Sequence, residues 1–370
     1  MTNNERSAPP FRAEHIGSLL RPPELIRAHH DFAAGKLSPE DFRSLQDNCI
    51  REVVKLQEDA GLKSITDGEF RRGSYFSHFI EALEGMEAKP ALFSFRDATG
   101  KEFEFGAPHV AGKLQRKRGI STGEFEFLRG VTRQTPKITM PSPSTMHFYR
   151  GRMGVAAAAY PDEDALFEDL VQIYREELAE LVKIGAQYIQ FVEVPLAMLC
   201  DPNIRKAVQG RGEDPDRLGR KYIEMLNAVL RNRPAGLIVG LHLCRGNYKA
   251  RWLAEGGYGA IADQLFGGVD VDAFFLEYDT PRAGDFAPLR SLNSSTIAVL
   301  GLISSKTPEM EPMDLLKRRV AEASQFVPME RLAISPQCGF ATSVGSKPMT
   351  RDDQIRKLEL IVNAAREIWT

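Results

Sequence analysis

The sequence is poor in cysteine, has almost no excess of charge of either sign, and contains no long apolar run. Four cysteines are scattered over 370 residues. This is too few for a disulfide framework, so each one is a core thiol, a nucleophile or a metal ligand. The 48 basic and 50 acidic residues give a net charge of −2, which provides no global attraction for nucleic acid or an anionic membrane.

No stretch approaches the roughly 20 apolar residues that a membrane span requires. The first residues, MTNNERSAPPFRAEHIGS, also lack the apolar centre of a secretory signal. We therefore expect a cytoplasmic protein that acts on small molecules, with neither nucleic acid nor membrane as a partner. The sequence leaves open whether the chain forms a homo-oligomer.

What the sequence does contain is an alternation of apolar strand-like runs with amphipathic helical stretches. In residues 161–186, for example, Leu166, Leu170 and Ile173 recur at helical spacing, and residues 214–232, 314–326 and 350–369 have the same character. Eight segments are strand candidates: 11–18, 62–70, 136–143, 186–194, 236–244, 272–279, 296–304 and 331–339.

Several of these strands are apolar on both faces, which is typical of a parallel sheet covered by helices. We therefore predict an α/β fold, a single TIM (β/α)8 barrel domain over residues 1–370, with a doubly wound open sheet as the alternative. Residues 89–135 mix Phe and Gly with charged residues and break the alternation. We interpret them as a hairpin-like excursion inserted after the second strand.

In a parallel barrel, functional side chains lie at the carboxyl ends of the strands. Polar, acidic and thiol residues collect at these ends, although buried strands rarely carry them for packing reasons alone. The residues concerned are His15, Gly17, Ser18, Asp67, Glu69, Ser142, Ser144, Glu193, His242, Cys244, Glu277, Asp279, Ser304, Ser305, Lys306 and Cys338.

The segment GLHLCRGN suggests half of a metal site. On a strand, His242 and Cys244 point to the same side. Zinc accepts imidazole, thiolate and carboxylate ligands, and Glu277 and Cys338 are available from later strands. The spacing matches no local zinc-finger pattern. The alternative therefore stays open that both cysteines are core thiols, that His242 is a hydrogen-bonded histidine, and that Glu277 pairs with Arg245 or Arg282.

Six motifs, taken in their order along the chain, resemble those of the cobalamin-independent methionine synthases. More narrowly, the sequence resembles short single-barrel relatives that correspond to the carboxyl-terminal half of those enzymes. The motifs are HIGSLLRP, TDGEFRRG, HLCRGN, FFLEYD, LGLISSKTP and SPQCGF, and the resemblance runs from about Phe11 to the end. It implies a zinc-dependent TIM barrel in which the family's ligands fall on His242, Cys244, Glu277 and Cys338. It also implies transfer of a methyl group from methyltetrahydrofolate to homocysteine.

The same resemblance implies further roles. Ile16, Gly17 and Ser18 match the segment that binds the homocysteine carboxylate, and Glu69 matches a substrate-binding glutamate. Without the resemblance, the first three residues read as a strand-end turn and Glu69 as an ion-pair partner of Arg71 or Arg72.

Other family positions depart from the pattern. The aspartate that holds the substrate amine is replaced by Val192, although the next acid remains as Glu193. A folate-binding acid aligns with Met198, the tryptophan that packs on the pterin with Tyr149, and a proton-donating histidine with Lys306. Lys306 is a candidate proton donor or leaving-group stabiliser, and an ion pair with Glu309 is its alternative.

These observations support three hypotheses. The first is an S-methyltransferase of methionine biosynthesis, in which a zinc-bound homocysteine thiolate attacks methyltetrahydrofolate or a related methyl donor. The second is another zinc-dependent thiol alkyltransferase, such as one resembling the epoxyalkane:coenzyme M transferases, with a cationic pocket around Arg12, Arg21 or Lys306. The third is a non-catalytic zinc-binding module, which predicts a closed four-ligand site without a cleft.

Overall fold

The central feature of the computed structural model is a six-stranded parallel sheet. The structure describes residues 6–97, 99–248, 251–345 and 349–369. The sheet has the order β12-β11-β10-β9-β8-β7, so that strands consecutive in the chain lie side by side. Its strands are β7 (Ile138–Pro141), β8 (Tyr188–Val192), β9 (Ile238–Leu243), β10 (Ala273–Glu277), β11 (Ile297–Ile303) and β12 (Leu332–Pro336). The predicted parallel α/β fold is confirmed.

Two further segments continue this order at its ends. Strand β1 (Ser64–Ile65) pairs in parallel with β6 (Thr135–Pro136), which directly precedes β7. At the other end, the first predicted strand forms only a parallel bridge, Ala13 with Ile334 of β12. Leu19, which directly follows this first segment, donates its amide to the carbonyl of Gly68, which lies shortly after β1, at 3.1 Å. The first predicted strand is thus a largely irregular segment next to β12.

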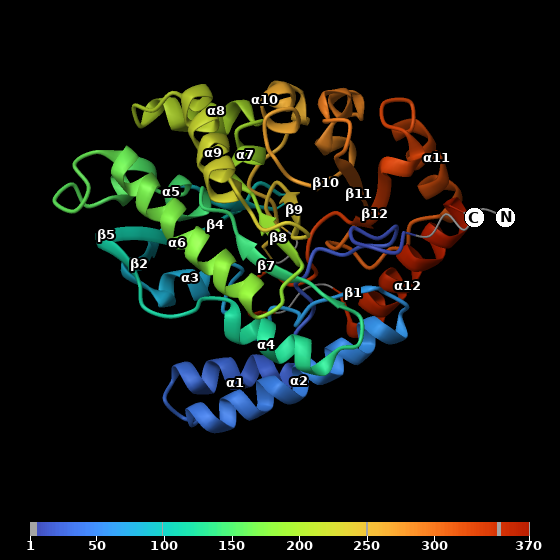
Figure 1. The fold of residues 1–370 in the computed structure, drawn as a ribbon, viewed down its shortest axis with the longest axis horizontal. Coiled ribbons are helices and arrows are strands. Elements are labelled where there is room, and N and C mark those ends of the chain that lie inside the picture. Colours follow the sequence, from blue (N-terminus) through green and yellow to red (C-terminus); the bar gives the residue numbers. More distant parts are fainter. Residues whose placement is uncertain (1–5, 98, 249–250, 346–348, 370) are drawn as a thin grey trace.

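Helices surround the strands (Figure 1). Helix α6 packs on α9 and on α4, and α11 packs on α12 beside β11 and β12. The helices are α1 (Pro23–Ala33), α2 (Pro39–Asp59), α3 (Ser77–Ala82), α4 (Thr122–Val131), α5 (Thr145–Phe148), α6 (Glu163–Lys183), α7 (Pro195–Met198), α8 (Pro202–Gly210), α9 (Pro215–Leu230), α10 (Ala262–Phe266), α11 (Met313–Ala323) and α12 (Arg351–Ile368). None of them is long and apolar enough to cross a membrane.

Local sequence explains where the longer helices begin. The side chain of Asp162 accepts a hydrogen bond from the Asp164 amide and caps α6, and Asp214 caps α9 in the same way. Helix α12 begins with a capping box in which Thr350 and Asp353 satisfy each other's backbone amides.

Side chains on the sheet alternate between two buried clusters. Phe275 and Val299 belong to an inner cluster, whereas their neighbours Phe274 and Leu300 belong to the outer cluster that packs against the helices. Because side chains on a strand alternate between faces, Glu277 lies on the inner face with Phe275. His242 is the register partner of Phe275 on β9, so these two polar residues share one side of the sheet.

The excursion predicted over residues 89–135 is antiparallel, but its first strand begins earlier than predicted, at Leu83. Strand β2 (Leu83–Pro90) pairs with β5 (Gly106–Arg116), and between them β3 (Phe95–Arg96) pairs with β4 (Glu102–Phe103). Helix α4 follows. The β2–β5 pair lies at the edge of the molecule beside α3 and α5 in Figure 1.

Candidate active site

Three of the four predicted metal ligands lie together at the carboxyl ends of β9 and β12. His242 is the fifth residue of β9, Cys244 follows the strand, and Cys338 follows β12. Each offers a ligand atom, and these atoms lie within 4.8 Å of one another. The two sulfur atoms are 3.6 Å apart, and all three residues are buried. They come together although β10 and β11 lie between β9 and β12 in the sheet.

The imidazole of His242 is oriented for metal binding. Its Nδ1–H donates to the carbonyl oxygen of Phe275 at 3.2 Å, which leaves the lone pair of Nε2 directed at the cysteines. Nε2 is buried and has no hydrogen-bond partner. A backbone carbonyl that fixes the tautomer and the ring orientation is the usual support of a metal-binding histidine, so these residues fit a metal ion of the zinc type.

The two thiols differ in acidity. The hydrogen bond between the two sulfur atoms lowers the pKa of Cys338 well below its usual range, and His242 lowers it further. The same hydrogen bond, together with burial, raises the pKa of Cys244. A metal ion bound here would hold both sulfur atoms as thiolates, the form that binds metals.

Glu277, the fourth predicted ligand, is not brought into this group. One carboxylate oxygen, Oε1, accepts from Arg282 at 2.5 Å and from Lys306 at 3.3 Å, and Oε2 accepts from the Arg245 amide at 2.7 Å. Although burial opposes ionisation, Lys306, Arg282 and Arg245 lower the pKa of Glu277 to about 2. This is the ion pairing that the sequence left open as the alternative.

Lys306 is held by acids on β10 and just after it. Its Nζ lies 3.3 Å from Glu277 Oε1 and 3.9 Å from Asp279 Oδ2, and these carboxylates take the place of the expected partner Glu309. Lys306 does not contribute to the wall of the cavity described next. In this arrangement the ammonium group orients Glu277.

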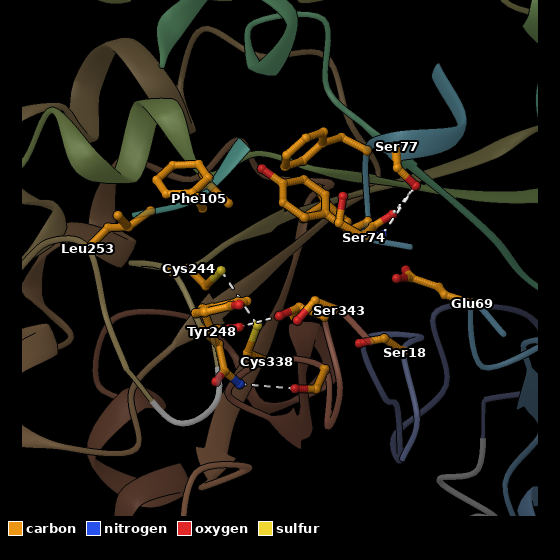
Figure 2. A pocket seen from close by; sticks show the side chains of 18 of the residues that line it. Ser18, Glu69, Ser74, Ser77, Phe105, Cys244, Tyr248, Leu253, Cys338 and Ser343 are labelled. Atoms are coloured by element: carbon orange, nitrogen blue, oxygen red, sulfur yellow. Dashed lines mark hydrogen bonds between the residues drawn. The ribbon is translucent and has the colours of Figure 1, made fainter. Parts of the chain in front are cut away.

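A cavity of about 320 Å³ opens beside the three ligands. In Figure 2, Cys244 and Cys338 lie at its centre, Glu69 and Ser18 lie to one side, and Phe105 and Leu253 lie to the other. The part with Glu69, Ser18 and Ile16 is called the acid end here. Half of the remaining wall residues are aromatic or aliphatic.

The acid end contains most of the residues that the resemblance assigned to substrate. One oxygen of Glu69, Oε1, accepts from Thr139 at 2.7 Å and lies 3.6 Å from Arg72, whereas Oε2 is buried without a partner. Burial raises the pKa of Glu69, and Arg72 and Thr139 oppose this shift. Gly17 does not line the cavity. A cationic substrate group here would pair with the free oxygen and favour the carboxylate form.

Glu193 is placed differently. It is buried, accepts hydrogen bonds from Ser142, from Ser144 at 2.6 Å, and from the Leu196 amide at 2.9 Å, and it does not line the cavity. The two strand-end serines therefore hold Glu193 against the start of α7, away from the cavity.

Of the positions that depart from the family pattern, Tyr149 and Val192 line the cavity and Met198 does not. The hydroxyl of Tyr149 is 2.8 Å from that of Tyr75. Val192 presents an apolar surface where the resemblance expects an acid.

The sequence did not identify the aromatic wall. Tyr75, Phe76, Phe95, Phe105 and Tyr248 all line the cavity. Phe95 and Phe105 come from the antiparallel excursion. The mixture of Phe with Gly and charged residues in that segment indicated only a hairpin. The sequence could not predict that this hairpin lies over the strand ends, because that position is a tertiary property.

A second cluster of His147, Glu163 and Glu213 also brings potential ligand atoms within 4.8 Å. Both ring nitrogens of His147 are already occupied, Nδ1 by Tyr222 at 2.8 Å and Nε2 by Glu163 at 3.0 Å, and Glu213 pairs with Arg211. This cluster connects α5 to α6 and α9 and leaves no ligand nitrogen free.

A parallel α/β sheet with a histidine and two cysteines at its carboxyl ends defines a TIM-barrel-like enzyme with a candidate metal centre. The chain belongs to the cobalamin-independent methionine synthase family: the family model described as "Cobalamin-independent synthase, Catalytic domain" matches residues 11–367. The resemblance seen in the sequence is thus confirmed. Membership supports methyltransferase activity of the methionine synthase type.

Individual relatives agree with this assignment. The uncharacterised Bacillus subtilis protein YxjH is 35% identical, over 100% of this chain and 97% of its own length. A methionine synthase of Pyrococcus abyssi is 27% identical, over 95% of this chain and 90% of its own length. Among solved structures, a putative vitamin-B12-independent methionine synthase from Listeria monocytogenes superimposes with a TM-score of 0.76 at 30% identity, covering 99% of this chain and 100% of its own.

Proposed function

We propose that this protein is a zinc-dependent S-methyltransferase that moves a methyl group from methyltetrahydrofolate or a related donor to the thiol of homocysteine, giving methionine. The observation that carries the proposal is the group of His242 Nε2, Cys244 Sγ and Cys338 Sγ beside a substrate-sized cavity. Three protein ligands with an open fourth position are typical of catalytic zinc.

Zinc held by these residues would keep a substrate sulfur in its nucleophilic thiolate form. The chain itself supplies the remaining functions. Phe275 orients His242 through its carbonyl. Glu69, supported by Thr139, offers its free oxygen to the substrate ammonium, and Ile16 and Ser18 line the same end of the cavity.

Glu277 has a place in this proposal as an additional, weaker ligand. It lies on the same face of the sheet as His242, and three cations keep it ionised. Lys306 would act through Glu277 rather than on the substrate, because its ammonium contacts that carboxylate and not the cavity. This replaces the expected proton-donor role of Lys306 by a positioning role.

The test combines metal analysis with methyl transfer. Wild-type protein purified without chelator should contain zinc and form methionine from homocysteine. Cys338→Ser should lose both properties, whereas Cys49→Ser, which changes a buried thiol on α2, should keep them. Wild-type protein without zinc, or full activity in Cys338→Ser, would contradict the proposal.

Val192 favours a second candidate, a zinc-dependent transferase for a thiol without an amine, as in epoxyalkane:coenzyme M transferase-like enzymes. Among the described wall residues there is no Lys or Arg. Arg12 and Arg21 donate to backbone carbonyls instead, which provides little support for an anionic thiol. Calorimetric titration of the zinc-loaded protein with homocysteine and with 2-mercaptoethanesulfonate separates the two candidates. The cavity beside the metal ligands disfavours a non-catalytic zinc module.

We also propose that residues 1–370 form one closed (β/α)8 barrel domain with residues 89–135 as an insertion. The parallel bridge between Ala13 and Ile334 supports closure, as does the hydrogen bond from the Glu14 amide to Ile334 at 2.9 Å. Hydrogen exchange tests it: the Glu14 amide should be protected as strongly as those of β9, and rapid exchange at Glu14 would argue for an open sheet.

A further inference from the structure

Six aromatic side chains form an unbroken arc over the metal ligands. Neighbouring ring centroids are 5.1 Å apart for Tyr248 and Phe95, 5.0 Å for Phe95 and Phe105, 5.1 Å for Phe105 and Tyr149, 6.3 Å for Tyr149 and Phe76, and 4.9 Å for Phe76 and Tyr75. All six line the cavity. We call them the aromatic arc.

Neighbouring rings of the arc meet at angles between 33° and 88°, so no two neighbours are parallel. The planes of Phe105 and Tyr149 meet at 88°, those of Tyr75 and Phe76 at 87°, and those of Phe95 and Phe105 at 62°. A planar ring system such as a pterin is best held between parallel faces. Moreover, about 320 Å³ is at the lower end of the roughly 300–1,000 Å³ of ligand pockets, and both substrates have to share it.

The electrostatic character of the cavity favours a cation. None of the described wall residues is Lys or Arg, so no cationic side chain of the wall opposes an onium ligand. Aromatic faces carry partial negative charge and attract ammonium and sulfonium groups, as in aromatic cages for methylated cations. The hydroxyls of Tyr75 and Tyr149 hydrogen-bond to each other at 2.8 Å. These two hydroxyls therefore need no hydrogen bond from a polar group of the ligand.

Apart from Glu69, which the proposed function assigns to the acceptor ammonium, the acidic groups of the described wall that could donate a proton to a leaving group are tyrosine hydroxyls. A methyl group on a neutral amine nitrogen, as in methyltetrahydrofolate, leaves readily only when that nitrogen is protonated. Burial raises the pKa of Tyr75 and Tyr149 above the usual tyrosine value, which makes them poor proton donors. The ammonium of Lys306 lies outside the wall and contacts Glu277. A donor that needs no proton suits this cavity better.

We propose that the methyl donor is a small methylated onium cation, a sulfonium or a quaternary ammonium, that binds in the aromatic arc. This inference rests on the proposed function, since homocysteine remains the acceptor. The acceptor thiolate sulfur forms a bond to the methyl carbon while the bond from that carbon to the onium centre breaks. The electron pair of the broken bond stays on the onium sulfur or nitrogen, so anion and cation become two neutral products without a proton transfer.

The first experiment measures binding and needs no catalysis. Choline and its neutral isostere 3,3-dimethylbutan-1-ol have the same shape and differ in charge. By calorimetric titration of metal-free wild-type protein, choline should bind about fivefold more tightly than the alcohol. Equal affinities, or no choline binding, would overturn the inference.

Matched variants test whether the preference for choline over the neutral alcohol arises from the aromatic arc. Phe105→Leu removes a ring of the arc but keeps an apolar side chain, and it should abolish most of the preference for choline. Phe103→Leu alters a partly buried ring of the same excursion that does not line the cavity, and it should leave the preference unchanged. Equal effects of the two variants would contradict binding in the arc.

The second experiment separates the donor class from the proposed function. Zinc-loaded protein receives homocysteine with methyl-deuterated S-methylmethionine, glycine betaine, methyltetrahydrofolate or methylcobalamin, and labelled methionine is measured. Labelled methionine formed from S-methylmethionine or from glycine betaine supports the inference and identifies which of the two onium compounds is the methyl donor. Label from methyltetrahydrofolate or methylcobalamin alone overturns the inference but leaves the proposed function intact. Absence of label with every donor contradicts the proposed function, and the choline titration then decides the cation site by itself.

Discussion

Replacing Gly17 by alanine should destabilise the protein and weaken acceptor binding, although Gly17 contributes no side chain to the cavity. Its φ of +139° lies in a region that residues with a Cβ rarely adopt, at a cost of about 1–3 kcal/mol. A Cβ would also lie 2.5 Å from Thr139 Cγ2, and such overpacking costs about 1–3 kcal/mol. Relief of this contact requires movement of Thr139, whose hydroxyl holds Glu69 at 2.7 Å.

A second substitution separates the two costs. Thr139→Ser removes Cγ2 and keeps the hydroxyl, so the double variant Gly17→Ala/Thr139→Ser should recover the overpacking part and retain the backbone part. Urea unfolding measures the free energies, and the KM for homocysteine reports on Glu69. Stability of Gly17→Ala within about 0.5 kcal/mol of wild type would refute the reasoning, as would a double variant that recovers nothing.

Three further outcomes are expected. In scanning calorimetry, zinc at 100 times its Kd should stabilise wild-type protein by about 2.7 kcal/mol but not His242→Gln, and equal stabilisation would argue against His242 as a ligand. Burial lowers the pKa of half-buried His29 to about 4, so its neutral form contributes stability above pH 6.5 that is lost as the pH falls toward 4. Allowing for its exposure, wild type should lose about 2 kcal/mol more than His29→Gln over this window, and parallel pH profiles of unfolding would contradict this. Thr350→Ala removes the cap of α12 and should cost about 1 kcal/mol in urea unfolding, whereas an exposed change such as Arg351→Ala should cost much less.

The sequence was most informative where the relevant interactions are local. Apolar periodicity located α6, α9 and α12 to within a few residues. Their first residues are also set locally, because Asp162, Asp214 and Thr350 cap amides two or three positions away. Seven of the eight strand segments contain strands of the structure. The first, around Ala13, forms only a bridge, since its place beside β12 depends on contacts more than 300 residues away.

The candidate site shows the same division. The period of two along a strand was enough to put His242 and Cys244 on one face. Cys338 follows β12, which β10 and β11 separate from β9 in the sheet, so its approach to the other two residues is a tertiary property. The side-chain partners could not be predicted in this way. Glu277 is directed toward Arg245, Arg282 and Lys306, because burial makes ion pairing with the surrounding cations decisive for a carboxylate.

By itself, the sequence determined the family, the alternation of strands and helices, and the choice of His242, Cys244 and Cys338 as candidate ligands, because these follow from residue identity, order and period. The tertiary structure alone decided that the Phe275 carbonyl accepts a hydrogen bond from His242 Nδ1 and that Nε2 is therefore left without a partner. It also decided that Lys306 serves Glu277 rather than the cavity, and that rings from the excursion form an arc above the cysteines. The physical reason is that partners and pockets arise from contacts between segments far apart in the chain, which no local pattern encodes.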